Sequence, residues 1–221
     1  MNLSFVIPAR NEAAGIRNCL QPLQKLRKRG HEVIVADGYS DDATCRLAAP
    51  LTDRIVTGKP CRATQMNAGA AAARGDLLVF LHADTRLPED AAAALAAVTP
   101  DDWGRFDVRL DGGHPCFRGI EKAMNLRSRL TGIATGDQGI FVGNRLFSAA
   151  GGFPPIPLME DIALSRRLGK YRRPLCLRQT VLTSSRRWER DGILNTVLLM
   201  WALRLGYAAG VNPARLARFY R

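Results

Sequence analysis

Two short acidic segments of the chain have the residue types and surroundings of a catalytic site. Asp84 ends an apolar run within His82-Ala83-Asp84. A carboxylate at the tip of a strand can hold Mg²⁺ or Mn²⁺ against phosphate oxygens, and the metal then assists a departing diphosphate as a Lewis acid. His82 is either a second metal ligand or a packed strand-end histidine. The alternative for Asp84 is a capping turn ahead of Pro88.

Glu160 and Asp161 form the second acidic segment. They follow a loop at residues 151–157 that holds three prolines and two glycines, and they begin a helix predicted at 160–168. A helix dipole favours negative charge in its first turn, so an ordinary acidic helix start is one interpretation. The catalytic interpretation is that Asp161, with Glu160 beside it, removes a proton from an acceptor, a task that one well-positioned carboxylate can perform.

Three further positions have side chains suited to a nucleotide. Asp37 follows an apolar run and can accept hydrogen bonds from an N–H edge of uracil or guanine, although Asp-Gly is also an ordinary turn. Arg62 opens a helix of small residues predicted at 61–73, where its guanidinium either neutralises a diphosphate or is merely solvated. The segment Gly136-Asp137-Gln138-Gly139 is either a loop over a substrate or a plain turn.

Alternating strands and helices are predicted to position these residues. Short apolar runs at 3–7, 32–36, 54–57 and 77–81 indicate buried parallel strands, and helices are predicted between them at 12–29, 42–49 and 61–73. This alternation predicts an α/β fold with a doubly wound, mostly parallel sheet flanked by helices. Ligands of such sheets bind beyond the carboxyl ends of the strands, where residues 8–12, 37–38, 58–59 and 82–84 would meet.

The second half of the chain has a less regular pattern. Helices are predicted at 88–98, 115–130 and 160–168, and strands at 106–110 and 140–142. We expect one domain over residues 1–190, followed by a C-terminal helical appendage at 191–221 that is both basic and apolar.

The positive charge is concentrated near the C-terminus. Residues 1–160 hold 19 Lys and Arg against 17 Asp and Glu, whereas residues 161–221 hold 13 against 3. Such a surface suits a phosphate-bearing substrate or an anionic membrane, or is simply solvated. Nucleic acid ranks last because the basic runs are not interleaved with aromatic residues.

The segment 193–211 is apolar almost all round, interrupted by Asn195, Thr196 and Arg204. Three interpretations stay open: a helix packed within the protein or in a homo-oligomer, a helix lying in a membrane interface, and a membrane-spanning helix. The nearby Arg215, Arg218 and Arg221 would suit anionic lipid headgroups.

Cysteine usage and the first residues favour the cytoplasm. The five cysteines are scattered without a C-x-x-C spacing, which argues against a disulfide framework or a zinc site. The opening MNLSFVIPARNE has only a short apolar run and is interpreted as a first strand rather than a signal peptide.

Several motifs in order resemble those of family 2 glycosyltransferases, which have the GT-A fold of nucleotide-diphospho-sugar transferases. The resemblance covers roughly residues 3–190 and is nearest to the short bacterial "transferase 2, rSAM/selenodomain-associated" type. It rests on VIPARNE, VIVADGYSDDAT, RATQMNAGAAAARGDLLVFLHADTRLP, TGDQGIFV and GGFPPIPLMEDIALSRRL.

The resemblance implies a role for each matching position. Asp84 would be the metal-binding end of the D-x-D motif, Asp161 the base of the E-D motif, and Asp37 the contact to the nucleobase. The remaining residues of the implied nucleotide-sugar site are Pro8, Arg10, Glu12, Arg62, Gln65, Asn67, Gly136, Asp137, Gln138, Arg187 and Trp188.

Three positions depart from the family pattern. His82 replaces the first Asp of D-x-D, and Tyr39 stands where a small residue is usual. Ser184 replaces the Gln of the Q-x-x-R-W motif of processive relatives, so Arg187 and Trp188 do not imply polymer synthesis. Aromatic packing beneath a basic surface is their alternative interpretation.

These observations favour an inverting glycosyltransferase that moves a sugar from a UDP- or GDP-sugar to a small, lipid-linked or other hydroxyl acceptor. We expect it in the cytoplasm or peripherally on the inner membrane face. A nucleotidyltransferase would normally begin with a Gly-rich basic loop, which PARNE is not. A non-catalytic, membrane-associated nucleotide-sugar binder is the other alternative.

Overall fold

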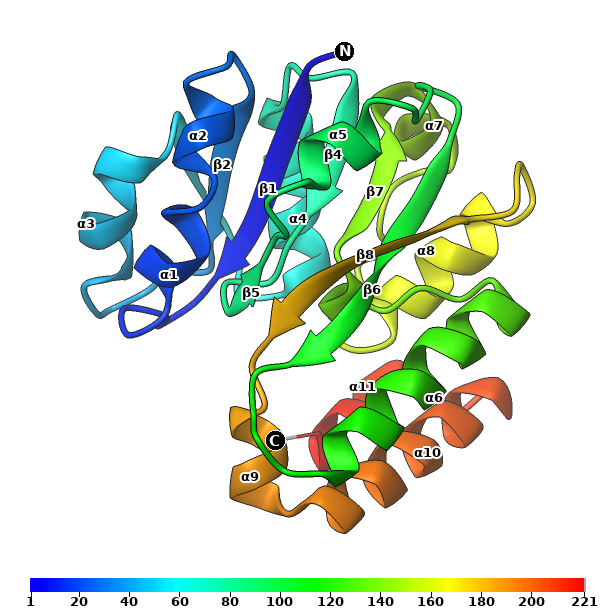
Figure 1. Ribbon diagram of the computed structural model, residues 1–221. Helices are drawn as coiled ribbons and strands as arrows, with labels where there is room; N and C mark the ends of the chain where they lie inside the picture. The colour runs from blue at the N-terminus through cyan, green and yellow to red at the C-terminus, as the bar shows by residue number, and fades with distance from the viewer. Residues whose placement is uncertain (221) are drawn as a thin grey trace.

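A computed structural model describes residues 1–220, so Arg221 lies outside the described residues. The fold is built on one eight-stranded sheet with the strand order β3-β2-β1-β4-β7-β6-β8-β5 (Figure 1). Its first half is parallel and consists of β1 (Leu3–Ala9), β2 (Glu32–Asp37), β3 (Arg54–Thr57) and β4 (Leu77–Phe80). The predicted α/β fold with a mostly parallel sheet is confirmed, although β3 is a half-buried edge strand.

One reversed strand separates the two halves of the sheet. β7 (Ile140–Gly143) runs antiparallel to β4 on one side and to β6 (Trp103–Leu110) on the other. Ile140, the first residue of β7, pairs with Phe80, the last residue of β4. The loop that enters β7 therefore lies at the edge where β4 ends, which brings residues from the second half of the chain to the predicted site.

Two strands complete the far side of the sheet, and the sequence patterns did not predict them. β8 (Leu175–Thr183) pairs parallel to β6, and the two-residue β5 (Thr85–Arg86) pairs antiparallel to the end of β8. Most of β8 is only partly buried, and it lacks the continuous apolar run that identified β1, β2 and β4.

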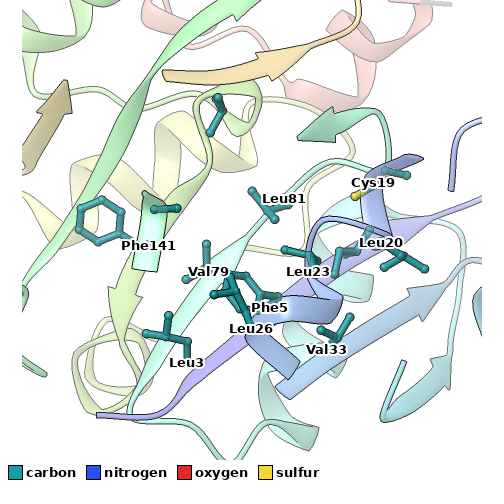
Figure 2. Close-up of a cluster of buried hydrophobic side chains, with 14 of the residues drawn as sticks. Leu3, Phe5, Cys19, Leu20, Leu23, Leu26, Val33, Val79, Leu81 and Phe141 are labelled. Carbon is teal, nitrogen blue, oxygen red and sulfur yellow. The ribbon is translucent and has the colours of Figure 1, made fainter. Parts of the chain in front are cut away.

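Helices cover both faces of the sheet, and the alternation of side chains along the strands explains the two layers. Phe5 and Ile7 point into one core cluster, whereas Val6 points into the other. Figure 2 shows the first cluster, in which Leu20, Leu23 and Leu26 pack on Phe5 and its neighbours in the strands. The first layer holds α1 (Ile16–Leu20), α2 (Gln24–Arg27), α3 (Thr44–Ala48), the one-turn η1 (Ala49–Leu51) and α5 (Ala91–Leu95), and the second holds α4 (Arg62–Ala72), α7 (Asn144–Ala149) and α8 (Glu160–Leu168).

The prediction of one continuous helix at residues 12–29 was wrong. The structure divides it into α1 and α2, with turns around residues 21–23. Pro22 explains the interruption, because proline has no N–H to donate and its ring would clash with the carbonyl of Asn18 one turn earlier.

α4 approaches the sheet closely, as its small residues suggested. A Cβ at Gly69 would lie 2.4 Å from a methyl carbon of Val6 on β1. The missing side chain therefore lets α4 pack directly on β1, which sets the position of Arg62 at the start of α4.

The remaining helices follow β6 and β8. α6 (Cys116–Thr131) packs on β6, where its Glu121 and Asn125 accept hydrogen bonds from backbone N–H groups of the strand. The C-terminal segment forms α9 (Arg186–Asp191), α10 (Ile193–Ala208), α11 (Pro213–Leu216) and the one-turn η3 (Ala217–Phe219).

The C-terminal helices join the domain through a third apolar cluster. Leu203 of α10 and Leu216 of α11 pack against Leu158, Met159 and Ile162 at the start of α8. Across residues 1–220, no helix combines the length and apolarity needed to cross a membrane.

Candidate active site

Two adjoining cavities open at the carboxyl ends of β1 and β4. The inner cavity has a volume of about 230 Å³ and the outer cavity about 300 Å³. Four residues line both: Arg62, Leu158, Glu160 and Tyr220. The inner cavity also contains His82, Asp84, Gly136, Asp137, Asp161, Arg187, Trp188, Met200 and Arg204, and the outer cavity contains Pro8, Arg10, Glu12 and Gln65.

Asp161 is held in a fixed orientation by backbone donors. One carboxylate oxygen accepts a hydrogen bond from the Gly136 N–H at 3.0 Å, and the other accepts one from the Ile162 N–H at 2.7 Å. The residue before the acidic pair, Met159, is buried and adopts a left-handed conformation with φ 68°. Such a conformation is unfavourable for a non-glycine residue, and here it turns the chain sharply into α8.

The neighbouring carboxyl groups of Glu160 and Asp161 have different surroundings. Burial, reinforced by the charge of Asp161, raises the pKa of Glu160 to about 7, while Arg62 opposes the rise. Burial also raises the pKa of Asp161, but its two backbone donors and the guanidinium groups of Arg62 and Arg127 oppose that rise. Burial thus raises the pKa of both groups, and Asp161 differs from Glu160 in the backbone donors that fix its two oxygens.

Arg62 links the acidic pair to the outer cavity. Its Nη1 lies 4.0 Å from Oε1 of Glu160, and its side chain is 46% exposed. The guanidinium therefore retains donors that face the open space between the two cavities. An anionic group bound there would meet a positive charge that the fold already holds in place.

Asp84 lies in the turn between β4 and β5 and lines the inner cavity. α5 begins only at Ala91, so Asp84 caps no helix. Burial raises the pKa of Asp84, and Arg186 and Arg62 oppose the rise. No ion pair within residues 1–220 involves its carboxylate.

His82 is neutral and lies against the backbone of Gly136. Burial lowers its pKa well below the usual value, and the charge of Arg62 adds to this. A Cβ at Gly136 would lie 2.3 Å from the Nε2 atom of His82, so only glycine fits there without displacement. Nε2 is buried without a hydrogen-bond partner, as is the Oδ1 atom of Asp137 beside Gly136.

The side chains of His82 and Asp84 fit a metal ion that is held partly by the protein and partly by a substrate. A neutral imidazole and a carboxylate are both suitable ligands, and two polar atoms in this cavity lack partners. The described residues contain no cluster of three potential metal ligands. Mg²⁺ commonly binds through one or two carboxylates, water and substrate phosphates, and this arrangement fits Asp84 better than a complete protein cage.

The outer cavity brings together the predicted residues that follow β1. Pro8, Arg10 and Glu12 line it, and a carboxylate oxygen of Glu12 lies 3.7 Å from Nη2 of Arg186 on α9. Burial and the charge of Asp84 raise the pKa of Glu12, whereas Arg186 and Arg62 lower it. The loop after β1 is thus joined electrostatically to the start of α9.

Gln65 lines the outer cavity but also has a structural role. Its Nε2 donates to the carbonyl oxygens of Ala9 and Ala36 at 2.8 and 2.9 Å. These bonds tie α4 to the ends of β1 and β2, where a nucleotide was expected.

The structure does not bring Asp37, Asn67 or Gln138 to the walls of either cavity. Both oxygens of Asp37 accept hydrogen bonds from Ser40 in the turn after β2. The amide of Asn67 is paired with the backbone of Phe153, and Gln138 caps the one-turn η2 (Gly136–Gln138) by accepting from the N–H of Thr135. These three side chains are engaged in holding loops.

Sequence reasoning missed several residues of the inner cavity, including Leu158, Thr183, Met200, Arg204 and Tyr220. Leu158 lies in the motif that leads to Glu160 and Asp161, whereas the other four come from regions that no motif covers. Of those four only Arg204 gave a signal, as a charge that interrupts an apolar helix. Arg127 on α6 was also missed. It does not line the cavity, but its charge acts on Asp137 and Asp161.

Tyr220 lies between the two cavities under Arg187. The guanidinium carbon of Arg187 is 3.7 Å from the centre of the Tyr220 ring, which is a cation–π contact. The Nη2 atom of Arg187 is buried without a hydrogen-bond partner. Arg187 therefore fits both interpretations. It packs on an aromatic ring, and it also has a donor that is free for a ligand.

Comparison with known proteins gives a family match over the first part of the chain. The sequence model described as Glycosyl transferase family 2 matches residues 4–130. A search of curated proteins finds no match.

Solved structures with the same fold have low sequence identity to this chain. A crystal structure of S. aureus TarS 1–349 has a TM-score of 0.69 at 18% identity and is matched over 84% of this chain and 61% of its own. The mannosyltransferase PcManGT from Pyrobaculum calidifontis, in complex with GDP-Man and Mn²⁺, has a TM-score of 0.64 at 19% identity, over 82% of this chain and 56% of its own.

A third similar structure also contains a metal ion and a nucleotide. Glucosyl-3-phosphoglycerate synthase from Mycobacterium tuberculosis, in complex with Mn²⁺, UDP and glucosyl-3-phosphoglycerate, has a TM-score of 0.60 at 19% identity, over 82% of this chain and 70% of its own. This chain spans about three fifths of the TarS fragment that it matches.

Proposed function

Because the chain belongs to glycosyltransferase family 2, we propose that it transfers a sugar from a UDP- or GDP-sugar to a hydroxyl acceptor with inversion at the anomeric carbon. The main observation that supports this proposal is the position of Asp161. Two backbone donors fix its carboxylate in the cavity that also contains Asp84 and Arg62. GDP-Man, UDP and Mn²⁺ in the similar structures support a nucleotide-sugar donor and a divalent metal.

Asp161 acts as the general base in this proposal. The acceptor oxygen attacks the anomeric carbon while its proton moves to the carboxylate of Asp161. The bond between that carbon and the diphosphate oxygen breaks, and the nucleoside diphosphate leaves with the electron pair. Hydrogen bonds from Gly136 and Ile162 fix the orientation of the carboxylate and oppose the rise of its pKa, which supports this role over one for Glu160.

Arg62 and the residues around it stabilise the negative charge of the leaving diphosphate. Arg62 lies between the two cavities and offers its guanidinium to the diphosphate. Asp84, with His82 beside it, would hold the divalent metal, which when bound supplies Lewis-acid assistance to the leaving diphosphate. Arg187 also lines the inner cavity, and its buried Nη2 atom has no hydrogen-bond partner among the described residues.

The finer features of the reaction are also proposals. We assign the chain to the "transferase 2, rSAM/selenodomain-associated" type on its motifs, with Mg²⁺ or Mn²⁺ as the metal and the cytoplasm, at the inner membrane face, as its location. The wall formed by Leu158, Met200 and Trp188 favours an acceptor with an apolar portion, as in a lipid-linked hydroxyl.

The base assignment can be tested by measuring donor turnover. Purified protein is incubated with Mn²⁺ and a panel of UDP- and GDP-sugars, and released nucleoside diphosphate is measured for the wild type and Asp161→Asn. We expect the variant to release it about 10²–10⁴-fold more slowly, because the general base is lost while the shape is kept.

Asp101→Asn is the matched control, since Asp101 is exposed and lines neither cavity. Turnover by Asp161→Asn equal to that of this control would exclude Asp161 as the base. Release of pyrophosphate from a nucleoside triphosphate and a sugar phosphate would show nucleotidyl transfer instead.

A further inference from the structure

α10 presents a row of large apolar side chains to solvent. Leu194, Leu198, Trp201 and Leu205 are 69%, 59%, 61% and 64% exposed. Their spacing of four, three and four residues places them on one face of the helix. We call this face the α10 stripe. A stable water-soluble helix normally turns polar residues outward, so an apolar outer face indicates a partner.

The opposite face of the same helix is anchored to the active site. Thr196 and Leu203 are buried, and Met200 and Arg204 line the inner cavity that contains Asp161. The guanidinium carbon of Arg166 on α8 lies 5.3 Å from the centre of the Tyr207 ring, which is a cation–π contact. The α10 stripe is therefore held rigidly on the outside of the wall whose inside faces the proposed base.

The charge around the stripe favours an anionic surface. Residues 161–221 hold 13 basic and 3 acidic residues. α11 packs on α10, and Arg215 of α11 and Arg218 of η3 are exposed and form no ion pair within residues 1–220. A second copy of the chain would bring the same positive charge against itself, whereas anionic headgroups neutralise it.

The length of α10 favours a position along the bilayer surface. Its 16 residues span about 24 Å, less than the roughly 30 Å hydrocarbon core. Tryptophan and leucine on one face of a helix are typical of helices that lie in the interface plane, and the arginines of α11 and η3 follow α10 directly in the chain.

We propose that the α10 stripe docks the enzyme on an anionic lipid bilayer, with Leu194, Leu198, Trp201 and Leu205 inserted among the headgroups and Arg215 and Arg218 on the lipid phosphates. The inner cavity then lies one helix diameter from the membrane surface, which suits an acceptor hydroxyl carried by a lipid. That acceptor class rests on the function proposed above, whereas the docking does not.

Vesicle sedimentation tests the docking without any measurement of activity. The full chain is mixed with phosphatidylcholine vesicles, with or without phosphatidylglycerol, in low and high salt. We expect binding to the anionic vesicles in low salt, and a loss of at least tenfold in the partition coefficient for Leu198→Glu/Trp201→Glu. Binding of the wild type should weaken as salt screens the headgroups.

Tyr171→Glu is the matched control, because its ring is 58% exposed on the loop after α8, away from the stripe. It should bind vesicles like the wild type, and circular dichroism should show all three proteins folded. Equal binding by the stripe variant, or equal recovery with neutral vesicles, would overturn the proposal. A wild-type dimer in light scattering that the stripe variant abolishes would identify a second copy as the partner instead.

Discussion

The two adjacent carboxyl groups at the start of α8 show how the surroundings of a side chain separate residues of similar chemistry. Asp161 accepts two backbone hydrogen bonds, whereas Glu160 has buried surroundings and one distant cation, Arg62. The sequence identified both residues, because the Pro-rich loop and the helix start are visible in it. It also favoured Asp161 as the base, but it could not show what distinguishes the two carboxylates, since the donors come from Gly136 and from the geometry of the helix turn.

The pKa of Glu160 gives the protein a specific pH dependence of stability. That pKa rises from 4.5 to about 7 on folding, so the folded state binds this proton more tightly than the unfolded state. The free energy of unfolding therefore falls as pH rises from about 4.5 to about 7. For Glu160→Gln we expect stability like that of the wild type near pH 5 and roughly 2–3 kcal/mol higher at pH 8, measured by urea unfolding.

Exposed Glu89→Gln controls for the loss of one negative charge. It should leave the pH dependence of unfolding as in the wild type. Parallel curves for the wild type and Glu160→Gln would mean that Glu160 is ionised in the folded protein throughout this range.

The predicted site residues that line neither cavity are those whose side chains hold loops in place. Asn67 lies in the strongest motif block, yet its amide binds the backbone of Phe153, which is 86 residues away in the chain. Such a pairing depends on tertiary structure, and a linear pattern has no means of predicting it. Tyr220 and Met200 reach the cavity for the same reason.

At the scale of elements, the close approach of η2 to the end of β4 builds the inner cavity. The reversed strand β7 makes this approach possible, because its first residue pairs with the last residue of β4. The sequence predicted a strand at residues 140–142 but not its direction, since strand direction depends on which neighbours pair. It also missed β8, whose partly exposed residues have no strong apolar pattern.

Gly136→Ala tests this approach. The new Cβ would lie 2.3 Å from Nε2 of His82, so we expect the free energy of unfolding to fall by about 1–3 kcal/mol. Adding His82→Ala should restore part of the loss, which a double-mutant cycle measured by urea unfolding would reveal as a coupling energy.

Gly119→Ala in α6 is the reference substitution, because no atom lies within 4 Å of its new Cβ. There we expect a gain of roughly 0.4–1 kcal/mol, since alanine favours the helix. An equal gain at Gly136 would show that His82 moves aside without cost.

At the scale of the whole molecule, the C-terminal segment contributes to the walls of the inner cavity. α10 packs on the start of α8 and contributes Met200 and Arg204 to the inner cavity. The predicted division at residue 190 stays a prediction. The α/β fold itself was predictable, because buried strands and intervening helices leave strong periodic patterns, whereas docking of an apolar helix leaves none.

Two leucines on α10 test whether this segment unfolds together with the sheet. Leu203 is 3% exposed, and Leu203→Ala should lower the free energy of unfolding by about 2–4 kcal/mol. Leu205 is 64% exposed, and Leu205→Ala should change it by less than about 0.5 kcal/mol. Both values come from urea unfolding followed by circular dichroism, and an unchanged main transition for Leu203→Ala would indicate an independently unfolding appendage.

The way the cavities are assembled along the chain bears on how such an enzyme diversifies. Residues 4–130, which match the family, supply Glu12, Arg62 and Asp84, whereas Trp188, Met200 and Arg204 come from later segments of the chain. Mutations that reshape the apolar wall therefore fall outside the part that the family shares. Changes to Trp188, Met200 or Arg204 would reshape the inner cavity while leaving Glu12, Arg62 and Asp84 of the matched segment in place.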